Sequence, residues 1–297
     1  MIDLSKMTTE MVNPRTQTLS AMSIREAIEV MNQENINAVK CIEDQYDMIE
    51  KVINITSDVL EQGGRIIYMG AGTSGRIGLL DAVECPPTFG VDYDTVVGLI
   101  AGGENAFVKA VEGAEDSKDF GKTDLIDHHL TNKDVVIGIA ASGRTPYVIG
   151  GLEYAQSIGA KTCAIVCNKN SEIKKVCPFT IEVEPGPEVL TGSTRLKAGT
   201  ATKLVCNMIS TISMIRIGKI YKNYMVDVKM SNEKLVTRGT NIVCSVTGCD
   251  SETAKAALDK SNGGVRIAIV MILLNCDKET ACAALENVHG RIQDLVG

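Results

Sequence analysis

Short apolar runs alternate with amphipathic stretches through the middle of the chain. Runs of this kind, brief and rich in Val and Ile, are typical of strands buried on both faces of a sheet. Alternation of such strands with helices predicts a doubly wound α/β fold with a mainly parallel sheet and right-handed crossovers. The predicted strands are Arg65–Met69, Thr95–Ile100, Asp134–Ala140, Lys161–Cys167 and Phe179–Val183, and the predicted helices between and after them are Gly75–Val83, Ala106–Glu115, Pro146–Ile158 and Ser171–Val176.

Helical patterns flank this region on both sides. Ser23, followed three positions later by Glu26, is a capping box that opens a helical pattern reaching, with interruptions, about Leu60. A long helical pattern from about Thr194 to Ile220 closes the α/β unit, and short helices are predicted beyond residue 230. We therefore expect an N-terminal helical segment at 1–54, an α/β domain at 55–222 and a small helical C-terminal domain at 223–297. The predicted C-terminal helices are Ser251–Ser261, Gly264–Leu274 and Lys278–Glu286.

Composition narrows the classes of function. The net charge of −7 argues against a broad grip on nucleic acid, which needs a basic face, but allows a small anionic substrate. The 10 cysteines lie largely in apolar runs, which is typical of buried free thiols in a reducing compartment. The start of the chain has no signal-peptide pattern, and no apolar run approaches the roughly 20 residues of a membrane span. We expect a soluble cytoplasmic protein with no membrane or nucleic-acid partner.

Two loops at predicted strand ends are suited to anion binding. The first contains Gly72, Thr73 and Ser74 and opens a helix, so backbone N–H groups, the helix dipole and two hydroxyls converge there. An ordinary Gly-rich turn with a Ser cap uses the same residue types, so this loop alone does not distinguish an anion-binding site from a simple turn. A similar loop ends the third strand, and two such loops in one sheet favour a phosphate held between them. The second loop contains Ser142, Gly143, Arg144 and Thr145, with Pro146 at the next helix start.

The same loops argue against a nucleotide. Gly70 to Gly75 fits the G-x-G-x-x-G pattern, but Asp92 and Asp94 precede the second strand, whereas the dinucleotide fingerprint needs an acid after it. Neither loop ends in the Gly-Lys-Ser/Thr of a P-loop, so a sugar phosphate fits better. A third polar segment follows the fifth strand. Ser193 could cap the long helix, and Arg195 and Lys197 could be solvated residues of its first turn, but their place in the same layer of loops leads us to expect that Ser193 and Lys197 contact the ligand.

Two glutamates are candidate acid–base groups. Glu84 precedes Pro86 and Pro87, which we expect to break the preceding helix, and Glu115 follows the second strand. Most glutamates are surface carboxylates, and each of these two, taken alone, would be interpreted as a surface residue. Paired around a sugar, however, one can act as acid and the other as base if burial raises one pKa towards neutrality.

Metal ligation is not indicated. His128 and His129 are adjacent, so their rings cannot share a helix face, and Cys163 and Cys167 lie together on a strand without a second pair. We expect neither a metal nor another cofactor.

Taken together, these motifs are specific enough to indicate a family. The chain resembles the N-acetylmuramic acid 6-phosphate etherases of the sugar isomerase (SIS) superfamily, and the likeness covers nearly its whole length. The Glu84 and Glu115 segments carry most of the specificity, because the Gly-Ser-Thr loops are common to many SIS domains. The strings that carry the resemblance are Gly70–Arg76, Asp81–Phe89, Ala110–Asp116, Ser142–Pro146, Thr8–Thr16 and Thr191–Lys203.

The resemblance implies a reaction and roles for the residues. The family removes the D-lactyl ether from carbon 3 of a phosphorylated amino sugar by elimination and then hydration, giving N-acetylglucosamine 6-phosphate and D-lactate. By this resemblance Glu84 protonates the leaving oxygen, Glu115 acts as base and activates water, and Thr73, Ser74, Ser142 and Thr145 bind the phosphate. It also implies a homodimer with sites near the subunit interface, where Lys197 or a partner residue completes the pocket. A regulatory sugar-phosphate-binding protein and an aldose–ketose isomerase of the same superfamily remain alternatives.

Overall fold

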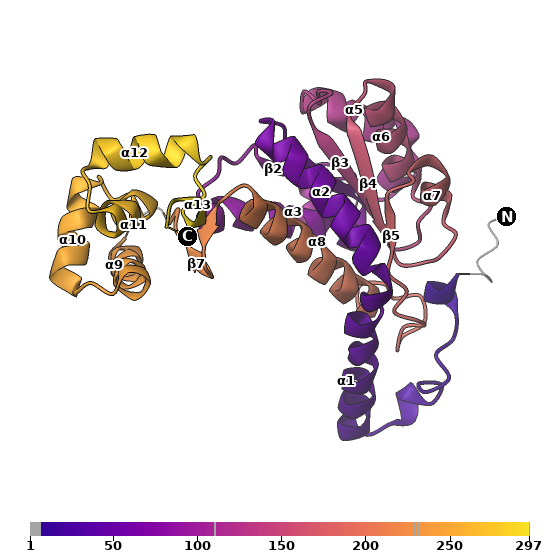
Figure 1. Cartoon of the computed structure of the whole chain (residues 1–297). Helices are drawn as coiled ribbons and strands as arrows, with labels where there is room; N and C mark the ends of the chain where they lie inside the picture. The colour runs from indigo at the N-terminus through magenta and orange to yellow at the C-terminus, as the bar shows by residue number, and fades with distance from the viewer. Residues whose placement is uncertain (1–6, 110, 229, 231, 297) are drawn as a thin grey trace. The chain divides into compact units, whose positions relative to one another are not determined.

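The computed structural model describes residues 7–109, 111–228, 230 and 232–296, which fall into two compact units (Figure 1). The first unit is drawn from residues 1–83 and 94–210, and the second from residues 84–93 and 211–297. The predicted divisions after residues 54 and 222 stay predictions, since these units are defined by packing and interleave along the chain.

A five-stranded parallel sheet forms the centre of the first unit, as predicted. Its order is β2-β1-β3-β4-β5, so the chain moves outward in one direction after β1 and in the other direction from β3. The crevice beside the carboxyl ends of β1 and β3 is therefore the topological switch point, where open α/β sheets bind ligands. The strands are β1 (Ile66–Gly70), β2 (Val96–Ile100), β3 (Val135–Ala140), β4 (Lys161–Val166) and β5 (Thr180–Glu182).

Helices cover both faces of this sheet because alternate strand residues point to opposite sides. Ile67 and Met69 pack with Val148 and Leu152 of α6 (Pro146–Ser157) on one side. On the other, Tyr68 donates a hydrogen bond to the carbonyl of Cys206 in α8. The remaining helices of the unit include α2 (Tyr46–Glu61), α3 (Gly72–Phe89), α4 (Asn105–Val108), α5 (Lys118–Asp127), α7 (Glu172–Val176) and α8 (Lys197–Arg216), with a 3₁₀ turn η4 (Ala114–Asp116).

Two sequence predictions about these helices are wrong. The helix predicted over 106–115 is only α4 and η4. Lys109 is extended and ends α4, and Gly113 has φ +76°, a left-handed conformation that does not continue a helix; residue 110 lies outside the described residues. Pro86 and Pro87 do not break α3. They stand in its last turn, where each lacks the backbone N–H of an ordinary residue, yet the helix runs on to Phe89 and Gly90 N donates to Pro86 O at 2.9 Å.

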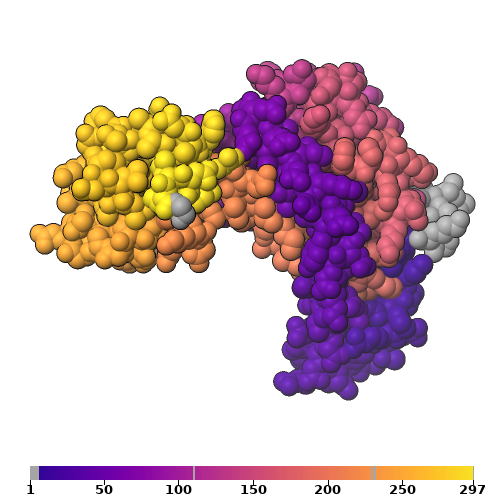
Figure 2. Space-filling view, viewed as in Figure 1, coloured from indigo at the N-terminus to yellow at the C-terminus, as the bar shows by residue number. Residues whose placement is uncertain are grey.

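The N-terminal helices belong to the first unit. The Ser23–Glu26 capping box is present and opens α1 (Ile24–Lys40), as predicted. The expected run to Leu60 is interrupted by the turn η3 (Glu43–Gln45) before α2 begins. In Figures 1 and 2, α1 projects away from the sheet, which agrees with its having only Glu34 and Ala38 buried among its residues. Two short turns precede it, η1 (Thr8–Glu10) and η2 (Leu19–Ala21).

The second unit is helical apart from a hairpin of β6 (Ile220–Tyr221) and β7 (Tyr224–Met225). Its core includes Val243, Ala268 and Ile269, and the three predicted C-terminal helices are confirmed. All 10 cysteines of the chain are free thiols, as expected. No helix within the described part of the chain is both long and apolar enough to cross a membrane. The helices are α9 (Glu233–Thr247), α10 (Ser251–Lys260), α11 (Val265–Leu274), α12 (Lys278–Asn287) and α13 (Gln293–Val296).

Candidate functional site

Glycines in the loop after β1 allow the start of α3 to lie very close to the strand. A Cβ on Gly75 would lie 2.6 Å from Gly70 O, so only glycine allows the start of α3 to approach the strand so closely. Gly72 adopts φ +52° and begins α3, which puts Thr73 and Ser74 in the first helical turn. Ser74 N and Gly75 N already donate to Ala71 O at 3.1 and 3.3 Å, so the hydroxyls of Thr73 and Ser74, together with the N–H groups before Ser74, form the donor set suited to an oxyanion.

The loop after β3 is equally constrained. Gly143 has φ +68°, and an added Cβ there would overlap the Cβ of Ser171, so this position needs glycine. Ser142 Oγ accepts a hydrogen bond from Arg144 N at 3.4 Å. Thr145 is the N-cap of α6, yet its side chain makes no capping hydrogen bond, which leaves the hydroxyl for a ligand. Because β1 and β3 are neighbours, the Gly72–Ser74 and Ser142–Thr145 loops lie at the same edge of the sheet.

The segment before α8 lies close to the first loop, but its backbone donors are already paired with a carboxylate of the same chain. A Cβ on Gly199 would lie 3.5 Å from the methyl group of Thr73, so the starts of α3 and α8 are close together. The buried carboxylate of Glu188 accepts hydrogen bonds from the backbone N of Lys197 at 3.0 Å and of Ala198 at 2.9 Å. Donors at the start of α8 are thus already occupied by a carboxylate of the same chain.

Lys197 has a partner that its sequence position did not indicate. Its ammonium lies 2.6 Å from Glu34 Oε2, and the side chains of Lys197 and Glu34 are only 1% and 5% exposed. Asn13 Nδ2 and Arg15 Nη1 also donate to this carboxylate, each at 2.9 Å. Burial opposes ionisation of Glu34, but these donors and charges outweigh it and lower the pKa of the carboxyl. Contact between Lys197 and a ligand stays a prediction, as does contact by the half-buried Ser193.

A small pocket of about 170 Å³ brings one predicted glutamate to the first loop. Gly72, Arg76 and Glu115 are among its lining residues. The Arg76 guanidinium donates to Ala106 O at 2.7 Å and to Phe107 O at 2.9 Å, which fixes it as a wall of the pocket. Arg76 was not among the predicted site residues, although it follows the Gly-rich loop directly.

The other predicted glutamate lies on the last part of α3, where the second unit begins. Glu84 and Glu115 are both exposed, so this chain does not supply the burial that sequence reasoning required of a catalytic acid. Asp81, three residues before Glu84 on the same helix, is buried. Asn207 Nδ2 and Ser210 Oγ of α8 donate to its Oδ1 at 2.6 and 3.1 Å, while burial raises the pKa of the carboxyl. This network ties α3 to α8 and was not predicted.

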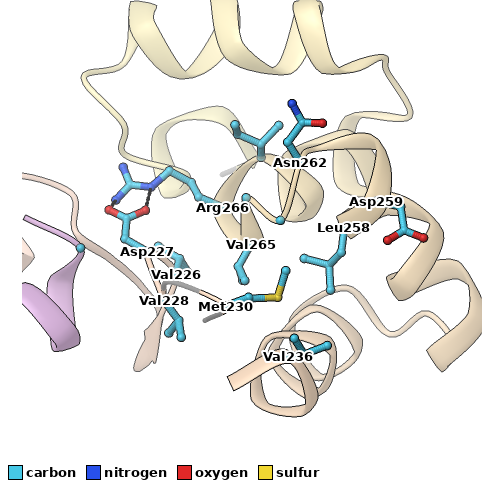
Figure 3. Close-up of a pocket in the computed structure, with 14 residues that line it drawn as sticks. Val226, Asp227, Val228, Met230, Val236, Leu258, Asp259, Asn262, Val265 and Arg266 are labelled. Carbon is cyan, nitrogen blue, oxygen red and sulfur yellow. Dashed lines mark hydrogen bonds and ion pairs between the residues drawn. The ribbon is translucent and has the colours of Figure 1, made fainter. Parts of the chain in front are cut away.

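A cavity of about 740 Å³ lies within the second unit (Figure 3). Arg266 pairs with Asp227 on its wall, through Nε to Oδ1 at 2.8 Å and Nη2 to Oδ2 at 2.5 Å. Its other side chains are mostly apolar, and none of the predicted site residues lines it. Over residues 7–109, 111–228, 230 and 232–296, no group of three His, Cys, Asp or Glu side chains could hold a metal ion.

Known families match three parts of the chain. Residues 121–212 match the SIS domain, residues 47–156 the N-terminal SIS domain of glucokinase regulatory protein, and residues 222–265 the C-terminal lid domain of that protein. Over 270 residues the chain is 60% identical to the N-acetylmuramic acid 6-phosphate etherase of Francisella tularensis subsp. holarctica. This alignment covers 91% of this chain and 92% of the relative. The chain belongs to the N-acetylmuramic acid 6-phosphate etherase family.

A second etherase supports the family assignment, and a solved structure supports the fold. The chain is 57% identical to the etherase of Bacillus mycoides over 271 residues, again 91% of this chain and 92% of the relative. A putative phosphosugar isomerase of Bacteroides fragilis superposes with a TM-score of 0.50 at 16% identity, over 65% of this chain and 91% of that one. At that identity the superposition supports the SIS fold alone. The predicted fold class and family are therefore both confirmed.

Proposed function

We propose that this protein cleaves the D-lactyl ether of N-acetylmuramic acid 6-phosphate, giving N-acetylglucosamine 6-phosphate and D-lactate. The observation that carries the proposal is the 60% identity to an etherase across 91% of the chain. The site is consistent with it, because two hydroxyl-bearing loops flank the switch point between β1 and β3. A phosphate is the ligand group that such helix-start loops bind best.

The reaction needs acid–base groups at two carbons of the open-chain sugar. A base removes the proton at carbon 2, which the neighbouring aldehyde acidifies, and the C3–O bond breaks as the leaving lactate oxygen takes a proton. Water then adds across the double bond, its hydroxyl to carbon 3 and its proton to carbon 2. We assign Glu84 to protonation of the leaving oxygen and Glu115 to proton abstraction and activation of water. The scheme is redox-neutral and routes no step through a metal ion.

We assign the phosphate to the loops after β1 and β3. Gly72, Thr73 and Ser74 belong to a helix start that the approach of α3 to β1 holds fixed. In the second loop, Thr145 keeps an uncommitted hydroxyl at the N-cap of α6. Ser193 and Lys197 are secondary candidates, because donors around them already serve Glu188 and Glu34. The predicted contacts of the second loop with phosphate also include Ser142, Gly143 and Arg144.

A homodimer completes the proposal. Both glutamates are exposed in the single chain, whereas a carboxylic acid that donates a proton near neutral pH needs a raised pKa, usually from burial. A second copy of the chain, together with substrate, would provide that cover. Exposed apolar side chains of the kind that mark interfaces are available on α1, α3 and α4, namely Ile24, Ile28, Val39, Leu80, Val83, Phe107 and Val108. A reducing, cytoplasmic location suits the free thiols.

The test is to incubate the purified protein with N-acetylmuramic acid 6-phosphate, without added metal, and to measure released D-lactate. Release in ¹⁸O-labelled water with the label at carbon 3 of the sugar supports elimination followed by hydration. Glu115→Gln should still bind the substrate but turn it over far more slowly. No release, with tight binding of the sugar phosphate, would instead favour a regulatory sugar-phosphate-binding protein, and light scattering reports the dimer.

A further inference from the structure

The N-terminal segment is tied to the sheet beside the predicted phosphate site. Thr9, in η1, is 1% exposed and meets Asn168, which follows β4 and is 4% exposed. Asn168 Nδ2 donates to Thr9 Oγ1 at 3.0 Å, and Thr9 N donates back to Asn168 Oδ1 at 3.4 Å. Polar side chains buried to this degree are rarely retained without full hydrogen bonding, which this pair has.

Asn168 also reaches the loop that we assign to the phosphate. Its Nδ2 donates to Ala141 O at 2.9 Å, and Cys167 N donates to the same carbonyl at 3.0 Å. Ala141 directly precedes Ser142, and the Ala141 carbonyl and the Ser142 N–H belong to one planar trans peptide. Fixing the carbonyl with two donors therefore fixes the direction of the Ser142 N–H, which points the opposite way.

The same N-terminal segment borders a second loop of the candidate site. A Cβ on Gly192 would lie 3.3 Å from Glu10 Oε2, and Gly192 directly precedes Ser193. Thr8 Oγ1 donates to Glu184 Oε1 at 2.5 Å, which anchors the other end of η1 beyond β5. Residues 8–10 thus contact the segment before α8 and, through Asn168, the loop after β3.

We propose that Asn168, held by Thr9, is a positioning residue that sets the orientation of the Ser142–Thr145 loop for the substrate's phosphate group. Asn168 touches no reacting atom in this proposal. It acts by holding the Ala141–Ser142 peptide in the orientation that binds the anion. The inference rests on the proposed function for the identity of the substrate, but not for the link between Asn168 and anion affinity.

Asn168→Asp is the sharpest perturbation, because it keeps the shape of the side chain and the Oδ1 acceptor but removes both Nδ2 hydrogens. The new oxygen would face the Ala141 carbonyl and turn that peptide away. We expect the KM for N-acetylmuramic acid 6-phosphate to rise by about tenfold or more while kcat changes by about twofold or less. The inhibition constant of inorganic phosphate should rise in parallel, since the defect lies at the phosphate.

Variants at neighbouring positions separate positioning from general loosening. Thr9→Val removes the hydroxyl that accepts from Asn168 and should raise KM in the same direction, whereas Thr9→Ser should restore it. Thr8→Val is the matched control, because it frees the same segment from Glu184 without touching the Asn168 contacts, and its KM should stay near wild type. Equal KM values for Asn168→Asp and wild type, or equal shifts for Thr8→Val and Thr9→Val, would overturn the proposal.

Binding measurements distinguish a failure of the proposed function from a failure of the positioning role of Asn168. Calorimetry with N-acetylglucosamine 6-phosphate and with inorganic phosphate measures affinity whether or not lactate is released. If the wild type binds but releases no lactate, and Asn168→Asp still binds about tenfold more weakly, the proposed function fails and the positioning role stands. If the wild type releases lactate and all variants bind equally, the positioning role fails alone.

Discussion

The Lys197–Glu34 ion pair offers a direct test of how the start of α8 is held. Lys197→Met keeps much of the side-chain volume but leaves the buried Glu34 carboxylate without its ammonium at 2.6 Å. Breaking a buried pair typically costs about 3–5 kcal/mol. Glu34 keeps its donors from Asn13 and Arg15, the latter half-exposed, so we expect the lower end, about 3 kcal/mol.

Urea unfolding followed by circular dichroism measures this loss as a lower midpoint with an unchanged slope. The double variant Glu34→Gln with Lys197→Met removes both charges and should recover part of the loss, which a double-mutant cycle quantifies. Lys203→Met, at an exposed lysine of the same helix, is the matched control and should shift stability by about 0.5 kcal/mol or less. If Lys197→Met matched this control in stability yet abolished substrate binding, the pair would not be structural and Lys197 would be a ligand contact.

Three further outcomes follow from the site and the sheet. Gly143→Ala should raise the KM for the sugar phosphate about tenfold in steady-state kinetics, because the new Cβ overlaps Ser171 and displaces the loop; an unchanged KM would contradict the phosphate assignment. Glu84→Gln should bind substrate in calorimetry but lose at least about 10²-fold in kcat, and a fully active variant would rule out the acid role. Burial alone would raise the pKa of Asp134, but hydrogen bonds from Arg65 and Thr131 outweigh it and lower that pKa, so its stabilisation is present above about pH 4 and is lost as the pH falls. Asp134→Asn should therefore cost about 2 kcal/mol in urea unfolding at pH 7 and progressively less in acid, and a cost independent of pH would refute this.

The strands could be predicted from the sequence because buried parallel strands have a strong local signal. Each strand of the five-stranded sheet falls within or one residue beyond a predicted run, since Val and Ile concentrate there, whereas the short hairpin strands β6 and β7 were not predicted. The helix α5 had no such signal, because it has few apolar positions. It approaches α6 closely at Gly121, and a local pattern does not report a tertiary contact of this kind.

In the candidate site, too, some features could be predicted from the sequence and others could not. The Gly-rich loops were predictable because positive φ and close backbone approach need particular residues at fixed positions. The partners of Lys197 and Asp81 were not predictable, because Glu34 lies 163 residues from the lysine and Ser210 lies 129 residues from the aspartate. Such pairings depend on how distant elements come together, and one sequence alone carries no record of that.

The free thiols provide the chain with built-in reporters of local opening. In the first unit four of five cysteines are buried, whereas in the second unit four of five are partly exposed. Burial raises the pKa of Cys167 to about 12, so its thiolate is scarce until the surrounding core opens. A thiol reagent followed over time by mass spectrometry should therefore modify the helical unit early and the sheet core only at the rate of its own unfolding. Without any introduced cysteine, comparing the buried Cys85 of the second unit with the buried Cys163, Cys167, Cys177 and Cys206 of the first would show which unit opens first.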